Sequence, residues 1–261
     1  MTRLQLVSDC SSCFGLCCVL MPFRARSGFG EDKDSGTPCR HLGADDGCGI
    51  HDGLRDRGWP GCTVFECFGA GQHVSQGTYG GTSWREADNL GEMAAVLSAM
   101  RQLHEMLFHL SEVERRSPSP AASELLERIT ALASGDAESV LGVDVDAVRA
   151  EVGAELGSAS ERIRGPLGAD RAGADLSGRD MRAEPLAGAC LRGALLLGAD
   201  LRECDLSDTD LLGADLRGAD VRGADLSAAV FLTQPQVNAT TGDGKTRLPA
   251  GLSRPGRWPA D

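Results

Sequence analysis

Cysteine thiols are the side chains of this sequence with the clearest capacity for chemistry, because a deprotonated thiol binds metal ions and a pair of thiols can form a disulfide. Eight of the ten cysteines of the 261-residue chain lie between residues 10 and 67. A stretch with many thiols and few large apolar residues needs a cross-link to fold, either a metal or disulfides. The eight are Cys10, Cys13, Cys17, Cys18, Cys39, Cys48, Cys62 and Cys67.

The spacing of the first four cysteines favours metal binding. Cys10 and Cys13 are three positions apart, so both thiols can reach one ion from a tight turn, which Gly15 makes easier. The adjacent Cys17 and Cys18 cannot easily reach the same tetrahedral centre. A bridging thiol, two centres or a cluster are therefore all open.

The later four cysteines are surrounded by glycine and aspartate, as expected for loops that wrap around an ion. His51 follows Cys48 by three positions and is the histidine best placed to add a ligand, whereas His41 and His73 are not expected to bind metal. A small apolar core is expected beneath the site, formed by Leu16, Leu42, Ile50, Val64, Phe65 and Phe68.

The cysteine pattern resembles the zinc- or iron-chelating cysteine-cluster family of bacterial proteins. The matching features are Cys-x-x-Cys followed by Cys-Cys, a Cys followed by Leu, a Gly-Cys-x-Ile step and a final Phe-x-Cys, over about the first quarter of the chain. His51 replaces the family's usual Tyr, and the Arg-Pro before the late cysteine is interrupted by Gly58 and Trp59. The resemblance implies that the eight thiols bind zinc, iron or an iron–sulfur cluster, and it implies no known reaction.

Composition narrows the class of protein. The formal net charge is −12, which argues against a general nucleic-acid binder. No segment approaches the ~18–20 apolar residues of a membrane helix, and residues 1–9 lack the layout of a secretory signal. A cytoplasmic protein is expected, and in that compartment thiols stay reduced and favour metal over disulfides.

Residues 81–160 are predicted to be helical. Ser83 to Glu86 has the pattern of a capping box, and the helix that follows should end at Pro118 and Pro120. Two further helices are expected, at 123–133 and after Asp144. His104 and His109 are five positions apart and not four, so they do not form the helical metal-binding pair of a zinc protease. The apolar stripe of the long helix comprises Leu90, Met93, Leu97, Met100, Leu103, Leu107 and Leu110.

From Ala174 the chain repeats every five residues. The residue two positions before each central one is small, with Arg179 and Glu184 as exceptions. A period of five fits neither a helix nor a strand, but it fits a chain that turns a corner after each unit. The central apolar residues are Leu176, Met181, Leu186, Leu191, Leu196, Leu201, Leu206, Leu211, Leu216, Val221, Leu226 and Phe231.

This repeat resembles the pentapeptide-repeat family, which implies a right-handed quadrilateral β-helix with four units per coil. Twelve units would make three coils, a column of ~14 Å at a strand spacing of ~4.8 Å. Cys204 is expected inside the column, and Cys190 on its outside as an exposed thiol. The expected organisation is a cysteine-cluster domain at 1–80, a helical region at 81–160, the β-helix at 169–233 and a C-terminal cap and tail at 234–261.

The leading hypothesis is a metal-binding pentapeptide-repeat protein that acts in binding, sensing or regulation through an unidentified protein partner. The first alternative is an iron–sulfur or zinc-dependent enzyme that uses the β-helix for docking. The second is a DNA mimic that protects gyrase, but a ~14 Å column would imitate only about four base pairs at ~3.4 Å each. The cap, with Leu248, Leu252 and Trp258, is expected to cover the end of the column, and a homodimer through it is conceivable.

Overall fold

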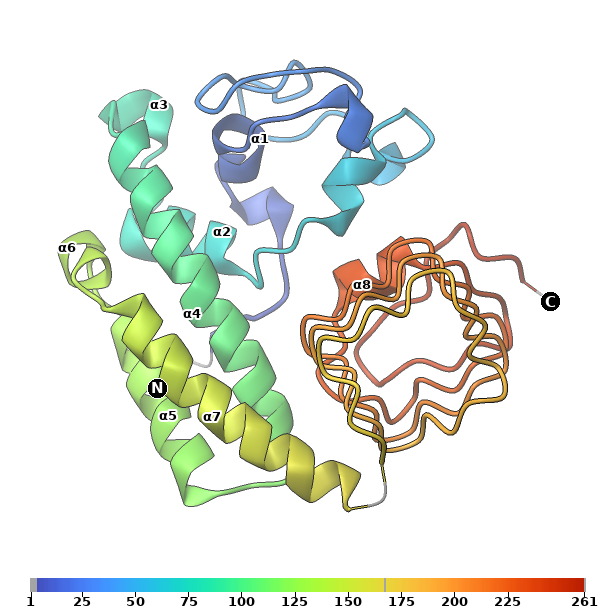
Figure 1. Cartoon of the computed structure of the whole chain (residues 1–261). Coiled ribbons are helices and arrows are strands. Elements are labelled where there is room, and N and C mark those ends of the chain that lie inside the picture. Colours follow the sequence, from blue (N-terminus) through green and yellow to red (C-terminus); the bar gives the residue numbers. More distant parts are fainter. Residues whose placement is uncertain (1–3, 167, 261) are drawn as a thin grey trace. The chain divides into compact units, whose positions relative to one another are not determined.

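The computed structural model describes residues 4–166 and 168–260, and these fall into two compact units, Met1–Leu156 and Gly157–Asp261 (Figure 1). The first unit contains the cysteine-rich segment and most of the helices, and the second contains the repeats. None of the helices in these described ranges is both long enough and apolar enough to cross a membrane.

The cysteine-rich segment has little regular structure. It contains the helix α1 (Leu16–Leu20), four short 3₁₀ turns and two isolated antiparallel bridges, Phe23 to Lys33 and Leu42 to Cys48. The 3₁₀ turns are Cys10–Ser12, Ala25–Ser27, His51–Gly53 and Pro60–Val64. Because loops bury little surface, this segment depends on a small cluster of side chains for its core.

That small core is aromatic. Phe23, Cys39, Ile50 and Trp59 are buried together, and the ring of Phe29 stacks on that of Phe23 with centroids 4.4 Å apart. Of the six apolar residues expected beneath the site, Leu16, Ile50 and Phe68 are buried, while Leu42 and Phe65 are half-buried. The expectation for Val64 is wrong, because this last residue of a 3₁₀ turn is 42% exposed.

The helical part begins with α2 (Ala70–Gln72), which continues into a π-helix (His73–Thr78). Ser83 does cap a helix, but that helix, α3 (Trp84–Ala87), is a single turn that stops at Asp88 in a left-handed conformation. The long helix α4 (Leu90–Arg116) is therefore separate. The helix α5 (Pro120–Ala133) begins at a proline, which suits a first helical position. The short α6 (Ala137–Leu141) was not expected, and α7 (Val145–Arg164) follows Asp144 as predicted.

Helix α4 is the central element of the first unit. It packs against α1 and α2 on the cysteine side and against α5 and α6 on the other. The predicted stripe is confirmed for six of its seven residues, because Met93, Leu97, Met100, Leu103, Leu107 and Leu110 are all buried, whereas Leu90 at the start of the helix is half-buried. Each such side chain contributes about 1.5–3 kcal/mol of burial free energy, so α4 provides the core that the cysteine loops lack.

The second unit is a column of coils. Parallel bridges pair residues twenty positions apart, for example Asp170 with Cys190, Cys190 with Asp210 and Asp210 with Val230, so each coil has four five-residue units. All twelve central apolar residues are buried, and eleven of them, Leu176 to Leu226, lie in the core of the column as predicted. At the last unit Leu232 joins that core, whereas Phe231 lies beneath the guanidinium of Arg192. The described residues form isolated bridges and no extended strand.

The pairing extends beyond the twelve repeat units at both ends. Asp170 pairs with Cys190 before the first unit, within the predicted bounds of 169–233, and the tail adds the pairs Asp220–Thr241 and Asp225–Arg247 beyond them. The predicted closing helix is α8 (Gln234–Ala239). Trp258 is 5% exposed and packs on the core of the column together with the half-buried Leu248 and Leu252, so the tail covers the column as expected.

One side of the column is covered by residues 157–164 of α7. The Ser160 hydroxyl donates to Asp210, and Arg164 donates to the carbonyl of Gly188. The guanidinium of Arg192 donates to the same Asp210 carboxylate, which is completely buried. Cys190 lies on this side and is 8% exposed, so the expectation of an exposed thiol is wrong.

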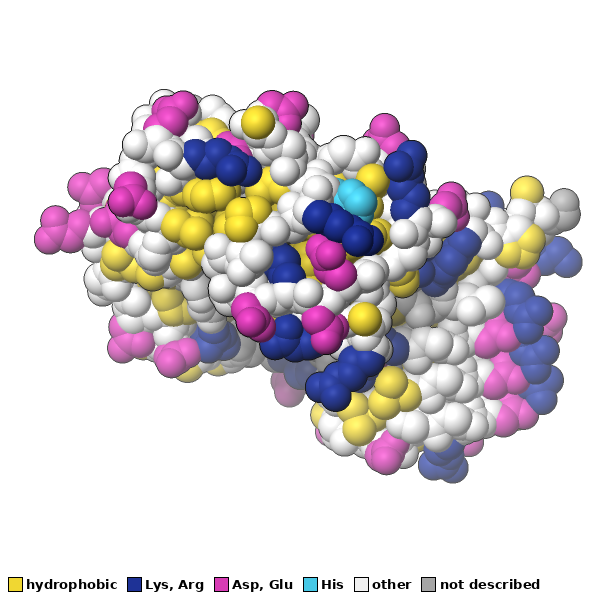
Figure 2. Space-filling view, turned by 90° about the horizontal axis from the view of Figure 1, so that it is seen from above, with side chains coloured by type: hydrophobic (Ala, Val, Ile, Leu, Met, Phe, Trp, Pro, Cys, Tyr) yellow, Lys and Arg dark blue, Asp and Glu magenta, His cyan; other side chains and the backbone are white. Residues whose placement is uncertain are grey.

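On another side of the column the outward carboxylates are paired with arginines. Arg182, Arg202 and Arg222 each form an ion pair with the aspartate two positions before them. Acidic and basic side chains therefore alternate along this side (Figure 2). Pairing of this kind cancels most of the local negative potential that a DNA mimic would present.

Candidate metal centre

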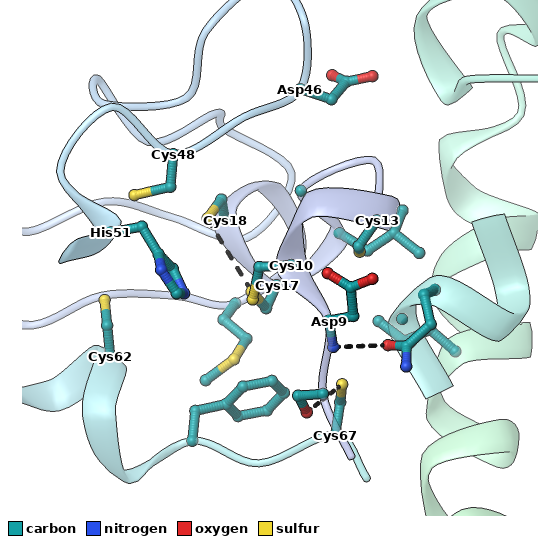
Figure 3. A pocket seen from close by; sticks show the side chains of 18 of the residues that line it. Asp9, Cys10, Cys13, Cys17, Cys18, Asp46, Cys48, His51, Cys62 and Cys67 are labelled. Atoms are coloured by element: carbon teal, nitrogen blue, oxygen red, sulfur yellow. Dashed lines mark hydrogen bonds between the residues drawn. The ribbon is translucent and has the colours of Figure 1, made fainter. Parts of the chain in front are cut away.

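The predicted thiols gather around one cavity. Its volume is about 110 Å³, and its lining is mostly apolar apart from the sulfur atoms (Figure 3). The eighth thiol, Cys39, is buried in the adjacent aromatic cluster and does not line the cavity. The seven that do are Cys10, Cys13, Cys17, Cys18, Cys48, Cys62 and Cys67.

The segment with the first four cysteines is attached to α2 and the π-helix. The Gln72 amide accepts a hydrogen bond from the backbone of Asp9 and donates one to the carbonyl of Val7. The Ser75 hydroxyl accepts from the backbone of Phe14 at 3.0 Å. π-Helical turns frequently occur at functional sites, and here Ser75 and Gln76 of the turn, with Gln72 of α2 just before it, hold the thiol segment.

Gly15 directs Cys17 and Cys18 into the cavity. It has φ +63 and precedes the first residue of α1, and a Cβ there would meet the Leu42 side chain at 2.3 Å. Only glycine fits this position without strain or displacement. Cys17 and Cys18 are therefore the second and third residues of α1, and both line the cavity.

Cys48 is positioned by a loop that Asp46 holds in place. Asp46 is nearly buried, has φ +60, and accepts hydrogen bonds from the Ser83 hydroxyl at 2.8 Å and from Arg85 Nε at 2.7 Å. The buried carboxylate thus ties the loop before Cys48 to the start of α3.

All ten cysteines are free thiols, and none is in a disulfide. Burial, followed by the neighbouring thiols, raises the pKa of Cys10 to about 12, and the same causes raise the pKa of Cys62 to about 12. Without a cation among them, these thiols hold their protons, because a buried thiolate is poorly solvated.

Cys17 and Cys18 form a coupled pair. Their sulfur atoms are 4.0 Å apart, a hydrogen-bonding distance for sulfur. This hydrogen bond, with Cys17 as donor, raises the pKa of Cys17 and lowers the pKa of Cys18. Cys18 is therefore the thiol of the pair that first becomes a thiolate.

A buried lysine lies beside Cys18. Lys33 is 7% exposed, and its ammonium donates to the carbonyls of Val19 and Met21 at the end of α1. Its positive charge contributes to the lowered pKa of Cys18. A fixed cation at this point offsets negative charge that thiolates would bring into the cavity.

The donor atoms share a cavity but do not converge. Within residues 4–166 and 168–260, no three His, Cys, Asp or Glu side chains lie close enough to hold one metal ion as they stand. The donor chemistry nevertheless fits a soft metal, since thiols in a reduced state are the preferred ligands of zinc, iron and iron–sulfur clusters. Binding would require the sulfurs to turn toward a common point.

The three histidines of the cysteine region differ. The His51 side chain lines the cavity and is 56% exposed. The ring of His41 packs edge-on against Trp59, with centroids 5.1 Å apart. His73 Nδ1 and His104 Nε2 are 2.8 Å apart, and His104 Nδ1 donates to the carbonyl of Phe68. Since His104 Nε2 must then accept, His73 is the donor of the pair.

A larger groove of about 700 Å³ lies beside the thiol cavity. The two share Ser8, Asp9, Cys10, Cys48 and His51 in their walls. The rest of the groove is lined by Ser11, Gly47, Gly49, Ile50, Asp52, Gly53 and Arg57. The thiol cavity is thus bordered by a space of mixed polar and apolar lining, of the size that small-molecule ligands occupy.

Sequence reasoning did not find Gln72, Ser75, Asp46 or Lys33. Each of these residues forms hydrogen bonds with residues 12 to 65 positions away in the sequence, so no local pattern identifies them. The small residues Gly69, Ala70 and Gly71 are the one available signal, because they allow another segment to approach α2 closely.

Comparison with known proteins identifies the repeats and one long match. A family model described as pentapeptide repeats matches residues 194–231 with eight copies. The uncharacterized protein YybG of Bacillus subtilis (strain 168) is 51% identical over 269 residues, which cover 97% of this chain and 95% of that protein. The match therefore extends over both units.

Two solved structures also match. The pentapeptide-repeat protein Rfr23 from the cyanobacterium Cyanothece 51142 is 24% identical over 35% of this chain and 54% of its own, with a TM-score of 0.21. A pentapeptide-repeat protein from the thylakoid lumen of Arabidopsis thaliana is 31% identical over 33% of this chain and 66% of its own, with a TM-score of 0.16. This chain spans less than two thirds of either structure.

Proposed function

This chain belongs to the pentapeptide-repeat family. We propose that it is a metal-binding repeat protein, in which a metal bound by thiols stabilises or regulates the first unit, and in which the repeat column serves as a platform. The observation that carries the proposal is the gathering of seven reduced thiols around one cavity of about 110 Å³. Eight thiols without a disulfide, in a segment with only a small aromatic core, are difficult to explain as packing alone.

The proposed ligands are the eight cysteines between Cys10 and Cys67, and the proposed metal is zinc, iron or an iron–sulfur cluster. The cavity supplies soft donors and an apolar wall, and Lys33 supplies a balancing positive charge. We also propose a cytoplasmic setting, because thiols remain available as ligands in a reducing compartment.

We propose that the repeats act as a platform for an unidentified protein partner. The ion-paired side of the column supports a recognition surface of alternating charge better than a mimic of uniformly charged DNA. Self-association through the C-terminal cap stays a prediction. Light scattering on the purified chain tests it, and a monomer at high concentration would exclude it.

A second candidate function is a metal-dependent enzyme. The observation that favours it is the groove of about 700 Å³, which shares Cys10, Cys48 and His51 with the thiol cavity and gives a small molecule access to it. An absorbance band in the visible range in anaerobically purified protein, lost on addition of a small ligand or oxidant, would favour this reading over a structural metal.

Thiol protection tests the primary proposal. The native full-length chain, purified without oxygen, is treated with a thiol reagent before and after a strong chelator. We expect few thiols to react before chelation and most of the eight to react afterwards, while Cys190 and Cys204 remain buried in the column in both cases. Equal reactivity before and after chelation would contradict metal ligation.

A further inference from the structure

The eight thiols divide into two groups of four according to the walls on which they lie. One group, the helix-side thiols, faces α2 and α4. The other group, the aromatic-side thiols, packs into the aromatic cluster around Trp59. The helix-side thiols are Cys10, Cys13, Cys17 and Cys67, and the aromatic-side thiols are Cys18, Cys39, Cys48 and Cys62.

Contacts with α2 define the helix-side thiols. The sulfur atoms of Cys13 and Cys67 lie 2.9 Å and 3.6 Å from the place where a Cβ of residue 71 would be, so both lie against the same point of α2. Cys10 begins the 3₁₀ turn Cys10–Ser12, and its carbonyl oxygen accepts a hydrogen bond from the backbone N–H of Cys13. None of these residues belongs to the aromatic cluster.

The aromatic cluster defines the other group. It contains Cys39, Phe23, Ile50 and Trp59, and Cys18, Cys48 and Cys62 pack against it. The backbone of Cys39 donates to the carbonyl of Cys18 at 2.9 Å, and Cys48 forms a bridge to Leu42 in the same cluster. The four thiols of this group come from four separate segments of the chain, namely α1, the 3₁₀ turn Pro60–Val64 and the loops that contain Cys39 and Cys48.

The two groups meet at Cys17 and Cys18. The 4.0 Å separation of these two sulfurs would allow them to share an ion, so their other neighbours decide the assignment. Cys18 packs against the aromatic cluster together with Cys48 and Cys62, whereas Cys17 does not belong to that cluster. The adjacent pair is therefore divided between the two groups of four.

We propose, as a deepening of the metal-binding function above, that the unit holds two separate metal centres, one on the helix-side thiols and one on the aromatic-side thiols. Each divalent ion binds four thiols and displaces their four protons to solvent, with no change of oxidation state. Lys33, at the end of α1, lies beside the aromatic-side centre and offsets part of its negative charge.

Stoichiometry tests this division. The full-length chain is reconstituted with zinc, freed of excess metal, and analysed by native mass spectrometry and elemental analysis. We expect two zinc ions per wild-type chain, one in Cys13→Ser, one in Cys62→Ser and none in the double variant. His51→Gln is the matched control and should keep both ions, because the proposed ligands are thiols only.

The outcomes separate this inference from the function on which it rests. One ion per wild-type chain, or a four-metal cluster with inorganic sulfide, would overturn the two centres and leave metal binding intact. Loss of an ion from His51→Gln would overturn the all-thiol assignment. Wild-type protein that takes up no metal would overturn the proposed function itself. If a variant fails to fold, titration of the wild type with cobalt(II) still decides, because thiolate-to-cobalt absorbance must saturate at two equivalents.

Discussion

Gly71 is the position at which an added side chain would clash directly with the thiols. A Cβ at this position would lie 2.9 Å from the sulfur of Cys13 and 3.6 Å from that of Cys67. We expect Gly71→Ala to displace Cys13 and to weaken metal binding at least ~10-fold, which corresponds to about 1.4 kcal/mol. Competition with a chromophoric chelator measures the change.

Gly91 in α4 provides the matched control for Gly71. A Cβ at Gly91 would meet no atom within 4 Å. Gly91→Ala should keep metal affinity unchanged and stabilise the helix by about 0.5–1 kcal/mol, because alanine has the higher helix propensity. If both variants bound metal equally well, the proposed position of Cys13 and Cys67 against α2 would be wrong.

His104 predicts a pH dependence that does not involve the thiols. Burial lowers the pKa of His104 to about 4, and His73 is the titratable group in contact with it. As the pH falls, His104 is therefore protonated near pH 6.5 in the unfolded chain but only near pH 4 in the folded chain. The contribution of His104 to the free energy of unfolding should be fully present above pH 6.5, and about 3 kcal/mol of it should be lost as the pH falls to 4.

The His104→Gln variant isolates this contribution. Unfolding free energies of both proteins are measured by urea denaturation between pH 7 and pH 4, with helical circular dichroism as the signal. The wild type should lose more stability than the variant over this range. A parallel decline of the two curves would show that His104 is not held neutral by the fold.

At the residue scale, the sequence predicted the thiols better than the residues that position them. The spacing of the cysteines was sufficient to place seven of them at one cavity. Gln72 and Ser75 were not predictable, because their partners, Val7, Asp9 and Phe14, lie more than sixty positions away. Cys190 was misplaced because α7 covers a face that the repeat pattern alone treats as exposed.

At the scale of elements, the buried carboxylate of Asp210 joins α7 to the column. It accepts hydrogen bonds from Ser160 and from Arg192, and its side chain is completely buried. Removal of one partner from a buried ion pair leaves the other uncompensated. We therefore expect Asp210→Asn to destabilise the column by about 3 kcal/mol in thermal unfolding.

Asp215 provides the control for Asp210. It forms an ion pair with Arg217, whose side chain is 71% exposed, so water screens the interaction. Asp215→Asn should cost about 1 kcal/mol or less. If the two variants were equally stable, residues 157–164 would not be packed on the column through Asp210.

The boundaries of helices were predictable only where local signals decide them. The apolar stripe placed α4 correctly, since a period of 3.6 is a local property. Ser83 was correctly identified as a cap, but the one-turn α3 that follows it stops at Asp88, and the sequence showed no sign of this stop. Pro120 was interpreted as a terminator, whereas it occupies the first position of α5.

At the scale of the whole molecule, the two units differ in what makes them predictable. The repeats encode their fold every five residues, so the coil could be derived from any stretch of them. The cysteine unit has no such redundancy, and its loops are defined by long-range contacts and, in our proposal, by metal. Its connection to α4 could be expected only because the stripe of α4 required a partner.

This difference predicts separate responses to a chelator. Structural metal contributes directly to the folding free energy of the unit that binds it. Calorimetry of the full-length chain should show two transitions, of which a strong chelator lowers the one that includes the helical signal by at least ~10 °C. The transition of the repeat column should not change. A chelator that shifted both transitions equally, or neither, would contradict the assignment of metal to the cysteine unit.

The metal content of the untreated protein tests the central claim most directly. The full-length chain is purified without oxygen and without added metal, and zinc, iron and sulfide are measured per chain, beside a variant with all eight cysteines from Cys10 to Cys67 changed to serine. We predict at least one zinc or iron per wild-type chain and none in the variant. Wild-type protein with eight reduced thiols and less than about a tenth of a metal ion per chain, a level expected of adventitious binding, would contradict it.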